Sequence, residues 1–431
     1  MAIKSPQGFI VDLPRGTQDL GTKDAIALKE ILSIIEEVFK RYGFSPIETP
    51  SIENTAILNA KAYGEQSKEL YILEGGETAL RFDLTVPLAR YMAMNRDITL
   101  PFKRFQTGRV WRKDEPQKMR EREFVQADID IVGSKDIRSD AECIAASAEA
   151  LASCEITEFT ILINSRGVLN TILDSYGIKN ETQVKAIRII DKILKIGFED
   201  TLKQLTSLGI DQANAQKLLD FLSQKGSNEE KLNKLAINVP NTNKEIDELT
   251  QLLKALSNYD IKGDVQIDFS LARGLDYYTG FVWEVVAALD GQRAPSIASG
   301  GRYDNLIGMY SKNPIPAVGS SIGVSRVFEL LRAKTGRKSY AKVFIANIGK
   351  ENIEYSMQIT RKLRAAGIYT DLNVAERGIS KQLDHANWLG ISHVAIIGSK
   401  EKEAGKVNLR DMSAGTEELL DVDALISRLK K

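Results

Sequence analysis

The stretch FKRFQTGRVW-RKDEPQKMRER-EFVQADIDIV spans residues 102–132 and predicts a strand-loop-strand unit. Segments 102–111 and 123–132 are rich in aromatic and β-branched residues, which is typical of strands. The charged, proline-containing segment 112–122 between them predicts a loop.

The loop and its flanks are strongly basic. Residues 103–122 contain eight basic and three acidic residues, a net charge of +5 in a chain whose overall net charge is zero. Such a segment attracts anions. A solvated hairpin tip is the alternative. Arg112 directly follows the apolar strand end Val110-Trp111, which favours a partly buried site, and a nucleoside triphosphate or RNA phosphate would suit it.

Polar residues follow two of the predicted strands. Gln126, Asp128 and Asp130 alternate along segment 123–132, so they share one face of the sheet, beside the arginines. A solvated sheet face explains the same spacing. Asp83 and Thr85 follow another predicted strand, where a carboxylate and a hydroxyl can bind an amine or begin a helix.

Residues 273–280, RGLDYYTG, combine a guanidinium, a carboxylate and two phenols. Glycine at both ends lets the backbone approach a ligand closely. The planar guanidinium of Arg273 matches a carboxylate or a phosphate. A strand-turn-strand with aromatic core residues is the alternative.

The composition is that of an ordinary globular protein. The chain has 431 residues, 43% of them hydrophobic, which predicts two or three domains. Two cysteines are too few for a disulfide framework or a cysteine-based zinc site. His385 and His393 are the only histidines, which excludes Ser-His-Asp catalysis and histidine-rich metal sites before residue 385. We see no signal peptide and no membrane span, so a cytoplasmic location is expected.

Hydrophobic periodicity predicts three further regions: the remaining helices and strands around the first unit, a helical insertion, and a C-terminal α/β region. Helices are expected at 24–42, 84–94, 140–153 and 325–333, strands at 78–82, 160–164, 265–269 and 280–287, and a turn at Gly300-Gly301. Residues 168–260 indicate a helical insertion. After a basic linker, strands at 342–348, 368–372 and 393–397 alternate with helices at 352–366 and 380–389, which predicts an α/β domain with a mainly parallel sheet.

Together these segments resemble the histidyl-tRNA synthetases, a family of class II aminoacyl-tRNA synthetases, over essentially the full length. The motifs occur in the family's order. Residues 47–53 resemble motif 1, 107–133 motif 2, 273–280 the histidine-binding signature, 317–326 motif 3, and 342 onward the anticodon-binding domain.

The resemblance implies an α+β fold: a class II synthetase catalytic domain built on an antiparallel sheet, with a helical insertion, plus a C-terminal α/β anticodon-binding domain. The implied boundaries are 1–167 and 261–334 for the two parts of the catalytic domain, 168–260 for the insertion, 335–341 for the linker and 342–431 for the anticodon-binding domain. Motif 1 implies a homodimer.

The resemblance also assigns roles to individual residues. For ATP it implies Arg112 and Arg273 at the α-phosphate, Arg326 at the γ-phosphate, Arg120 at the outer phosphates, Phe124 on adenine and Asp114 at its amino group. For histidine it implies Asp83, Thr85 and Gln126 at the α-amino group, Arg273 at the carboxylate, Asp130 and Tyr278 at the imidazole, and Tyr303 and Tyr277 in the pocket. We expect Tyr277 to pack behind the site, and Gln117 to contact tRNA.

The implied reaction joins histidine to its tRNA. ATP, in complex with Mg²⁺, would activate L-histidine, and the product would be transferred to histidine tRNA, with no prosthetic group, no metal site in the protein and no membrane. Two alternatives share parts of this fold. The regulatory subunit of ATP phosphoribosyltransferase lacks the C-terminal domain, and a pseudo-synthetase module of a stress kinase has a degraded site.

Overall fold

The computed structural model describes residues 3–4, 6–7, 10–61, 69–117, 119–272, 277–289, 292–293, 296–332 and 336–430. Two compact units are formed by the described residues of Met1–Gln18 with Glu30–Leu330, and of Asp19–Lys29 with Leu331–Lys431. The division passes through helix α1 (Thr22–Arg41).

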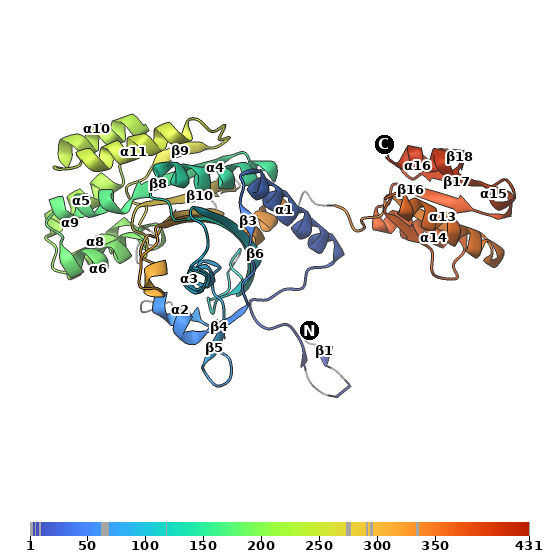
Figure 1. Cartoon of the computed structure of the whole chain (residues 1–431), viewed down its shortest axis with the longest axis horizontal. Coiled ribbons are helices and arrows are strands. Elements are labelled where there is room, and N and C mark those ends of the chain that lie inside the picture. The colour runs from blue at the N-terminus through green and yellow to red at the C-terminus, as the bar shows by residue number, and fades with distance from the viewer. Residues whose placement is uncertain are drawn as a thin grey trace. The chain divides into compact units, whose positions relative to one another are not determined.

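A curved nine-stranded sheet forms the centre of the first unit (Figure 1). Its order is β3 (Ser45–Pro46), β6 (Phe102–Trp111), β7 (Glu123–Val132), β13 (Ala317–Gly323), β12 (Ala298–Arg302), β10 (Phe281–Leu289), β8 (Phe159–Ser165) and β9 (Asp264–Ile267), with β11 (Gln292–Arg293) paired to β10. The pairs are antiparallel except β3–β6 and β8–β9. The predicted antiparallel sheet is therefore confirmed.

The β6–β7 hairpin agrees with the sequence prediction at both ends of both strands. In its antiparallel register Arg104 lies opposite Asp130, and Gln106 lies opposite Asp128. On its other side β7 pairs with β13, which places Ser321 opposite Asp128. These polar positions share one face because side chains alternate along a strand.

Helices cover both faces of this sheet (Figure 1). α4 (Ile137–Ser153) packs on β7, β12 and β13 through an alanine-rich face, and α3 (Thr85–Met94) lies on the opposite side, within the curve. α1 contributes Phe39, whose ring centroid lies 6.0 Å from that of Phe105 in β6. Small residues on α4 allow its backbone to approach the sheet closely.

The remaining elements of the first unit surround this core. They are β1 (Ile3–Lys4), β2 (Ile10–Val11), β4 (Ile52–Asn54), α2 (Thr55–Lys61), β5 (Thr78–Leu80), η2 (Ile307–Met309) and α12 (Val324–Leu331). The predicted helical insertion is formed by α5 (Arg166–Ser175), α6 (Asn180–Ile190), α7 (Ile193–Ile196), α8 (Phe198–Ser207), α9 (Gln212–Leu222), α10 (Asn228–Asn238) and α11 (Asn243–Leu256), of which α11 packs on α4.

One strand was interpreted wrongly from the sequence. Gly300 and Gly301 were expected to form a turn, but both lie within β12, paired to β10 and β13. A Cβ atom at Gly300 would collide with the ring of Trp283 and with the carbonyl of Gly319. The glycine here provides room for a neighbouring strand rather than a change of chain direction.

The second unit contains a five-stranded sheet in the order β15 (Thr370–Leu372), β14 (Val343–Asn347), β16 (His393–Ile397), β17 (Lys406–Asp411) and β18 (Glu417–Asp421). The first three strands are parallel, as predicted, whereas β17 and β18 are antiparallel and were not predicted. The helical elements are η4 (Lys350–Asn352), α13 (Ile353–Ala365), α14 (Ile379–Leu389), α15 (Ser399–Glu403) and α16 (Val422–Lys430).

The structure also describes the length and polarity of the helices and the state of the two cysteines. None of the helices that the structure describes is both long and apolar enough to cross a membrane. Both cysteines, Cys143 and Cys154, are buried and free. Burial raises the pKa of the Cys154 thiol to about 12, so this thiol stays protonated and unreactive at neutral pH.

Candidate active site

A pocket of about 220 Å³ adjoins the face of β7 that carries the alternating polar residues. Pockets for drug-sized ligands usually measure about 300–1,000 Å³, so this one suits a smaller molecule. Its lining consists of Glu69, Phe82, Asp83, Thr85, Arg112, Gln126, Asp128, Asp130, Tyr277, Tyr278, Ser299, Tyr303, Gly319, Ser320 and Ser321.

The pocket brings together most of the residues that the sequence singled out for an amino-acid site. These are Asp83, Thr85, Arg112, Gln126, Asp130, Tyr277, Tyr278 and Tyr303. The expectation that Tyr277 packs behind the site is wrong, because Tyr277 and Tyr278 both line the pocket. Their ring centroids lie only 4.2 Å apart, so the two rings form one wall.

The predicted ATP residues form a linked group at the β6–β7 loop. The guanidinium of Arg112 lies 5.1 Å from the ring centroid of Phe124. Arg120 pairs with Asp114 at 2.9 Å. Gln117 and Arg120 exchange backbone hydrogen bonds across the tip of the loop.

Of the two remaining arginines predicted to bind ATP, the structure describes Arg326. Arg326 in α12 donates from Nε to the carbonyl of Met119 at 3.4 Å and from Nη1 to that of Ser296 at 2.5 Å, so it adjoins the same loop. Arg273 lies outside the described residues. Arg326 and the loop residues Asp114, Gln117, Arg120 and Phe124 are not part of the pocket lining.

Asp130 is held from two sides. Nη2 of Arg104 lies 2.5 Å from one carboxylate oxygen, and the hydroxyl of Tyr303 donates to the other. Arg104 is fully buried, and it also donates to the carbonyl of Leu84 at 3.2 Å. The sequence analysis included Arg104 among the basic residues expected to attract an anionic ligand. In the structure its guanidinium instead pairs with the buried carboxylate of Asp130.

The two aspartates of β7 have raised pKa values. Burial raises the pKa of Asp128 to about 6 and that of Asp130 to about 7. The positive charge of Arg104 acts in the opposite direction on both. The carboxylate of Asp128 also raises the pKa of Asp130, and that of Asp83 raises the pKa of both. Near neutral pH Asp130 is therefore partly protonated and Asp128 is mostly ionised, and a cation bound beside them would favour the ionised form of both.

Arg112 and Asp83 are fixed by the backbone. Nε of Arg112 donates to the carbonyl of Phe82 at 3.0 Å, which directs the guanidinium along the pocket. Asp83 accepts a hydrogen bond from the amide of Val86 at 3.0 Å, in the first turn of α3. Asp83 therefore binds the start of a helix, as one interpretation expected, and the same residue lines the pocket, while its binding of an amine stays a prediction.

Two glycines allow the pocket to form. A Cβ atom at Gly319 would collide with the carboxylate of Asp130, on the adjacent strand. A Cβ atom at Gly301 would lie 2.8 Å from the ring of Tyr278. Only glycine leaves space for these two side chains.

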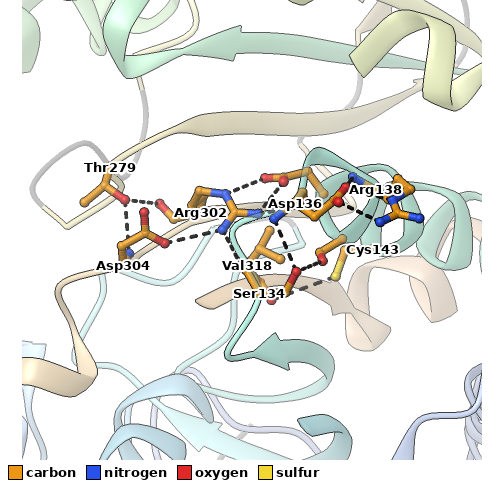
Figure 2. Close-up of polar contacts among 10 residues, drawn as sticks. Ser134, Asp136, Arg138, Cys143, Thr279, Arg302, Asp304 and Val318 are labelled. Atoms are coloured by element: carbon orange, nitrogen blue, oxygen red, sulfur yellow. Dashed lines mark hydrogen bonds and ion pairs between the residues drawn. The ribbon is translucent and has the colours of Figure 1, made fainter. Parts of the chain in front are cut away.

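Arg302 anchors the end of β12, which directly precedes the pocket residue Tyr303. Its Nη2 pairs with Asp140 at 2.5 Å, and its Nη1 donates to the carbonyl of Ser134 at 2.7 Å. The amide of Thr279 donates to the carbonyl of Arg302 at 2.7 Å, and the hydroxyl of Thr279 accepts from the amide of Asp304. Figure 2 shows Arg302 between Thr279 and Asp304 on one side and Asp136 on the other.

Some pocket residues were missed by the sequence prediction. Glu69 received no role. Gly319, Ser320 and Ser321 were recognised only as part of segment 317–326, whose glycines suit close approach to a ligand, and Ser299 only as part of a glycine-containing segment. Asp128 was recognised only as a member of the polar strand face. The alternation along β7 was the signal that could have included Asp128. No sequence pattern marks Glu69, which precedes β5 and reaches the site only through the fold.

The described residues contain no group of three or more His, Cys, Asp or Glu side chains that could hold a metal ion. Among the residues that the structure describes, the pocket lining offers several buried acceptors and one guanidinium, that of Arg112. Such a site binds a small molecule that carries a positive group, a ring with N–H donors, or both.

Comparison with known proteins identifies the family. A model described as histidyl-tRNA synthetase matches residues 16–327, and a model of an anticodon binding domain matches residues 342–431. The chain is 37% identical over 433 residues to a histidine–tRNA ligase of Korarchaeum cryptofilum, covering 98% of this chain and 99% of the relative. The chain belongs to the histidyl-tRNA synthetase family.

Other members of the histidyl-tRNA synthetase family agree in length and fold. A histidine–tRNA ligase of Wolinella succinogenes is 39% identical over 415 residues, covering 93% of each chain. The crystal structure of a histidyl-tRNA synthetase from Nostoc sp. PCC 7120 has a TM-score of 0.86 at 33% identity, covering 97% of this chain and 98% of that one. The catalytic fold and the C-terminal α/β fold are thus those of the family.

Proposed function

We propose that this chain activates histidine with ATP, forming histidyl-adenylate and pyrophosphate, and then transfers the histidine to the 3′ end of histidine tRNA. The observation that carries the proposal is the pocket, in which Asp130, held by Arg104 and Tyr303, shares one small volume with Asp83, Gln126 and Arg112. Membership of the family supports the same activity.

Histidine recognition rests on acceptors at the two ends of the pocket. Asp130 accepts a hydrogen bond from one imidazole nitrogen, and Tyr278 bonds the other, beside Tyr277 and Tyr303. Asp83, Thr85 and Gln126 hold the α-ammonium group. A site built from buried polar groups rejects analogues that leave those groups unpaired, by a factor of about 10⁴ or more.

Activation requires positioned cations rather than a general base. The ionised carboxylate of histidine attacks the α-phosphorus, a new O–P bond forms, and the bond to pyrophosphate breaks. Arg112 and Arg273 stabilise the charge on the α-phosphate. Arg326 and Arg120 hold the outer phosphates, while Phe124 stacks on adenine and Asp114 accepts from its amino group. The hydrogen-bonded link between Arg326 and the loop supports this grouping.

Transfer to tRNA is the second step. A ribose hydroxyl attacks the carbonyl carbon of the adenylate, AMP leaves, and a phosphate oxygen takes the proton. ATP enters as its Mg²⁺ complex, and the enzyme uses no prosthetic group. Gln117, at the tip of the β6–β7 loop, contacts the tRNA.

The other parts of the chain have supporting roles in this proposal. Residues 342–431 bind the anticodon, in agreement with the domain model that they match. The presence of this domain disfavours the regulatory subunit of ATP phosphoribosyltransferase. The catalytic domain comprises 1–167 and 261–334, interrupted by the insertion at 168–260, and 335–341 is a linker. Residues 47–53 form the interface of a homodimer, which works in the cytoplasm.

Histidine-dependent exchange of pyrophosphate into ATP, followed by tRNA charging, tests the activity. We expect both reactions with histidine and neither with other amino acids. No exchange by folded protein contradicts the proposal. Asp130→Asn and Tyr278→Phe are expected to raise the KM for histidine at least about tenfold, as the loss of a charge-assisted hydrogen bond predicts, and to leave the KM for ATP nearly unchanged. Equal effects on both substrates would disprove the imidazole assignment.

A further inference from the structure

Asp128 is a buried carboxylate with one oxygen that accepts no hydrogen bond from the residues that the structure describes. Its side chain lines the pocket and is only 2% exposed. Oδ1 has no hydrogen-bond partner among the described residues, and neither has Oε1 of Gln126, the adjacent residue on the same strand face. Buried carboxylate oxygens are normally paired, so an open one at a pocket wall indicates a ligand.

Ser321 fixes the direction of both groups. The amide nitrogen of Gln126 donates to the Ser321 hydroxyl at 2.6 Å, and the same hydroxyl is hydrogen-bonded to the carboxylate of Asp128. A serine hydroxyl has one proton, so Ser321 accepts from Gln126 and donates to Asp128. Oε1 of Gln126 and Oδ1 of Asp128 are left without a hydrogen-bond partner in the part of the chain that the structure describes.

The charges of the pocket favour a cationic ligand. The described lining has four carboxyl groups, Glu69, Asp83, Asp128 and Asp130, and one guanidinium, Arg112. Arg104, behind the lining, makes its ion pair with Asp130 rather than with Asp128. Asp128 makes no ion pair with the described residues, although the charges of Arg104 and Arg112 favour its ionised form, so a positive group on the ligand would add to that stabilisation.

We infer that Asp128 binds the α-ammonium group of the histidine substrate through Oδ1, alongside Oε1 of Gln126. Asp128 and Asp130 then bind opposite ends of one molecule, the ammonium group and the imidazole. They lie two residues apart on one strand face, a separation of about 7 Å that suits the two ends of a bound amino acid. The inference rests on the proposed function and adds to it a residue that determines specificity.

A comparison of two ligands on two variants tests this role. The ligands are L-histidine and imidazolepropionate, which is histidine without its amino group, and calorimetry measures their affinities. Asp128→Asn is expected to weaken histidine about 10- to 100-fold, the effect of a charge-assisted hydrogen bond, and imidazolepropionate less than about threefold. Asp130→Asn is the matched control and weakens both ligands, because both retain the imidazole.

The possible outcomes distinguish a failure of the role of Asp128 from a failure of the proposed function. Equal losses for both ligands in Asp128→Asn, or no loss for either, overturn the role of Asp128 and leave the proposed function intact. Absence of histidine binding by the unaltered protein overturns the proposed function itself. Thermal unfolding shows whether the variant folds. If it does not, Ser321→Ala, which keeps the carboxylate but removes the group that directs it, must show the same preference for weakening histidine over imidazolepropionate.

Discussion

At the scale of single residues, the site depends on carboxylates whose charge is controlled by distant parts of the chain. Asp130 on β7 contacts Arg104 from the neighbouring strand and Tyr303 from the segment after β12. The sequence showed that the polar residues of β7 share a face. It did not show that Arg104 points to the same side, because that depends on the pairing of two strands rather than on either strand alone.

The raised pKa values predict opposite pH dependences for folding and for binding. The empty folded protein retains protons on Asp128 up to about pH 6 and on Asp130 up to about pH 7, whereas unfolded aspartates lose them near pH ~3.9. The contribution of these two groups to the free energy of unfolding is therefore largest below about pH 4, and it is lost as the pH rises from about 4 to about 7. Histidine needs the ionised carboxylates, so its affinity should rise with pH over the upper part of the same window.

Calorimetric titration with histidine between about pH 5 and about pH 8, together with Tm of the empty protein, measures both effects. The imidazole of free histidine also titrates, near pH ~6.5. The Asp128→Asn variant, measured over the same pH range, keeps the pH dependence that comes from the imidazole of histidine and loses the part that comes from Asp128. An affinity profile of the same shape in the variant would contradict the assignment.

Arg104→Gln tests the cation behind the pocket. Arg104 lowers the pKa of Asp130, so its loss should raise that pKa further and increase the KM for histidine at pH 7, with partial recovery in more alkaline buffer. Removing one partner of a fully buried ion pair also destabilises a protein by about 3–5 kcal/mol. Exchange kinetics across pH and thermal unfolding measure the two effects. Arg104→Lys, which keeps the charge, should restore most of the pH profile, and a KM that does not change with pH in Arg104→Gln would refute the electrostatic role.

At the scale of elements, strands rich in aromatic and β-branched residues were predicted well and glycine-rich strands were not. The β6–β7 hairpin was predicted to the residue, because both segments have this composition and are bounded by a proline and a charged loop. β12 was missed because paired glycines usually indicate a turn. In this fold those glycines make room for Trp283 and Tyr278, which only the assembled sheet reveals.

Gln117→Ala tests the role of the loop at the tip of this hairpin. We expect tRNA charging to fall about tenfold, the effect of losing one hydrogen-bonded base contact, and pyrophosphate exchange to remain unchanged. The loop is closed by backbone hydrogen bonds between Gln117 and Arg120, which the substitution leaves in place. A parallel loss of exchange would show that Gln117 serves the first step instead.

At the scale of the whole molecule, each unit has its own hydrophobic core. The C-terminal clusters draw only on residues from Ala341 to Leu429. Length and the change in periodicity after residue 341 predicted this independence, since a separate core is the physical basis of a domain. The antiparallel β17–β18 hairpin was not predicted, because its short polar strands have weak periodicity.

A chain ending at residue 341 tests the division of labour. Because the core of residues 342–431 is separate, the shortened chain should fold and retain histidine-dependent pyrophosphate exchange within about threefold, while tRNA charging falls about 100-fold or more. The two assays on the same preparation, with the full chain beside it, measure the difference. Full charging by the shortened chain would contradict an anticodon-binding role for this domain.

The protons held by the empty pocket also matter for inhibitor discovery. In a screen in mildly acidic buffer the carboxyl groups of Asp128 and Asp130 are largely protonated, which favours the binding of compounds without a basic amine. The same screen above pH 7 presents carboxylates and rewards amines. Two laboratories using different buffers would therefore rank one compound library differently. Binding assays at two pH values distinguish compounds that imitate the amino acid from those that only fill the cavity.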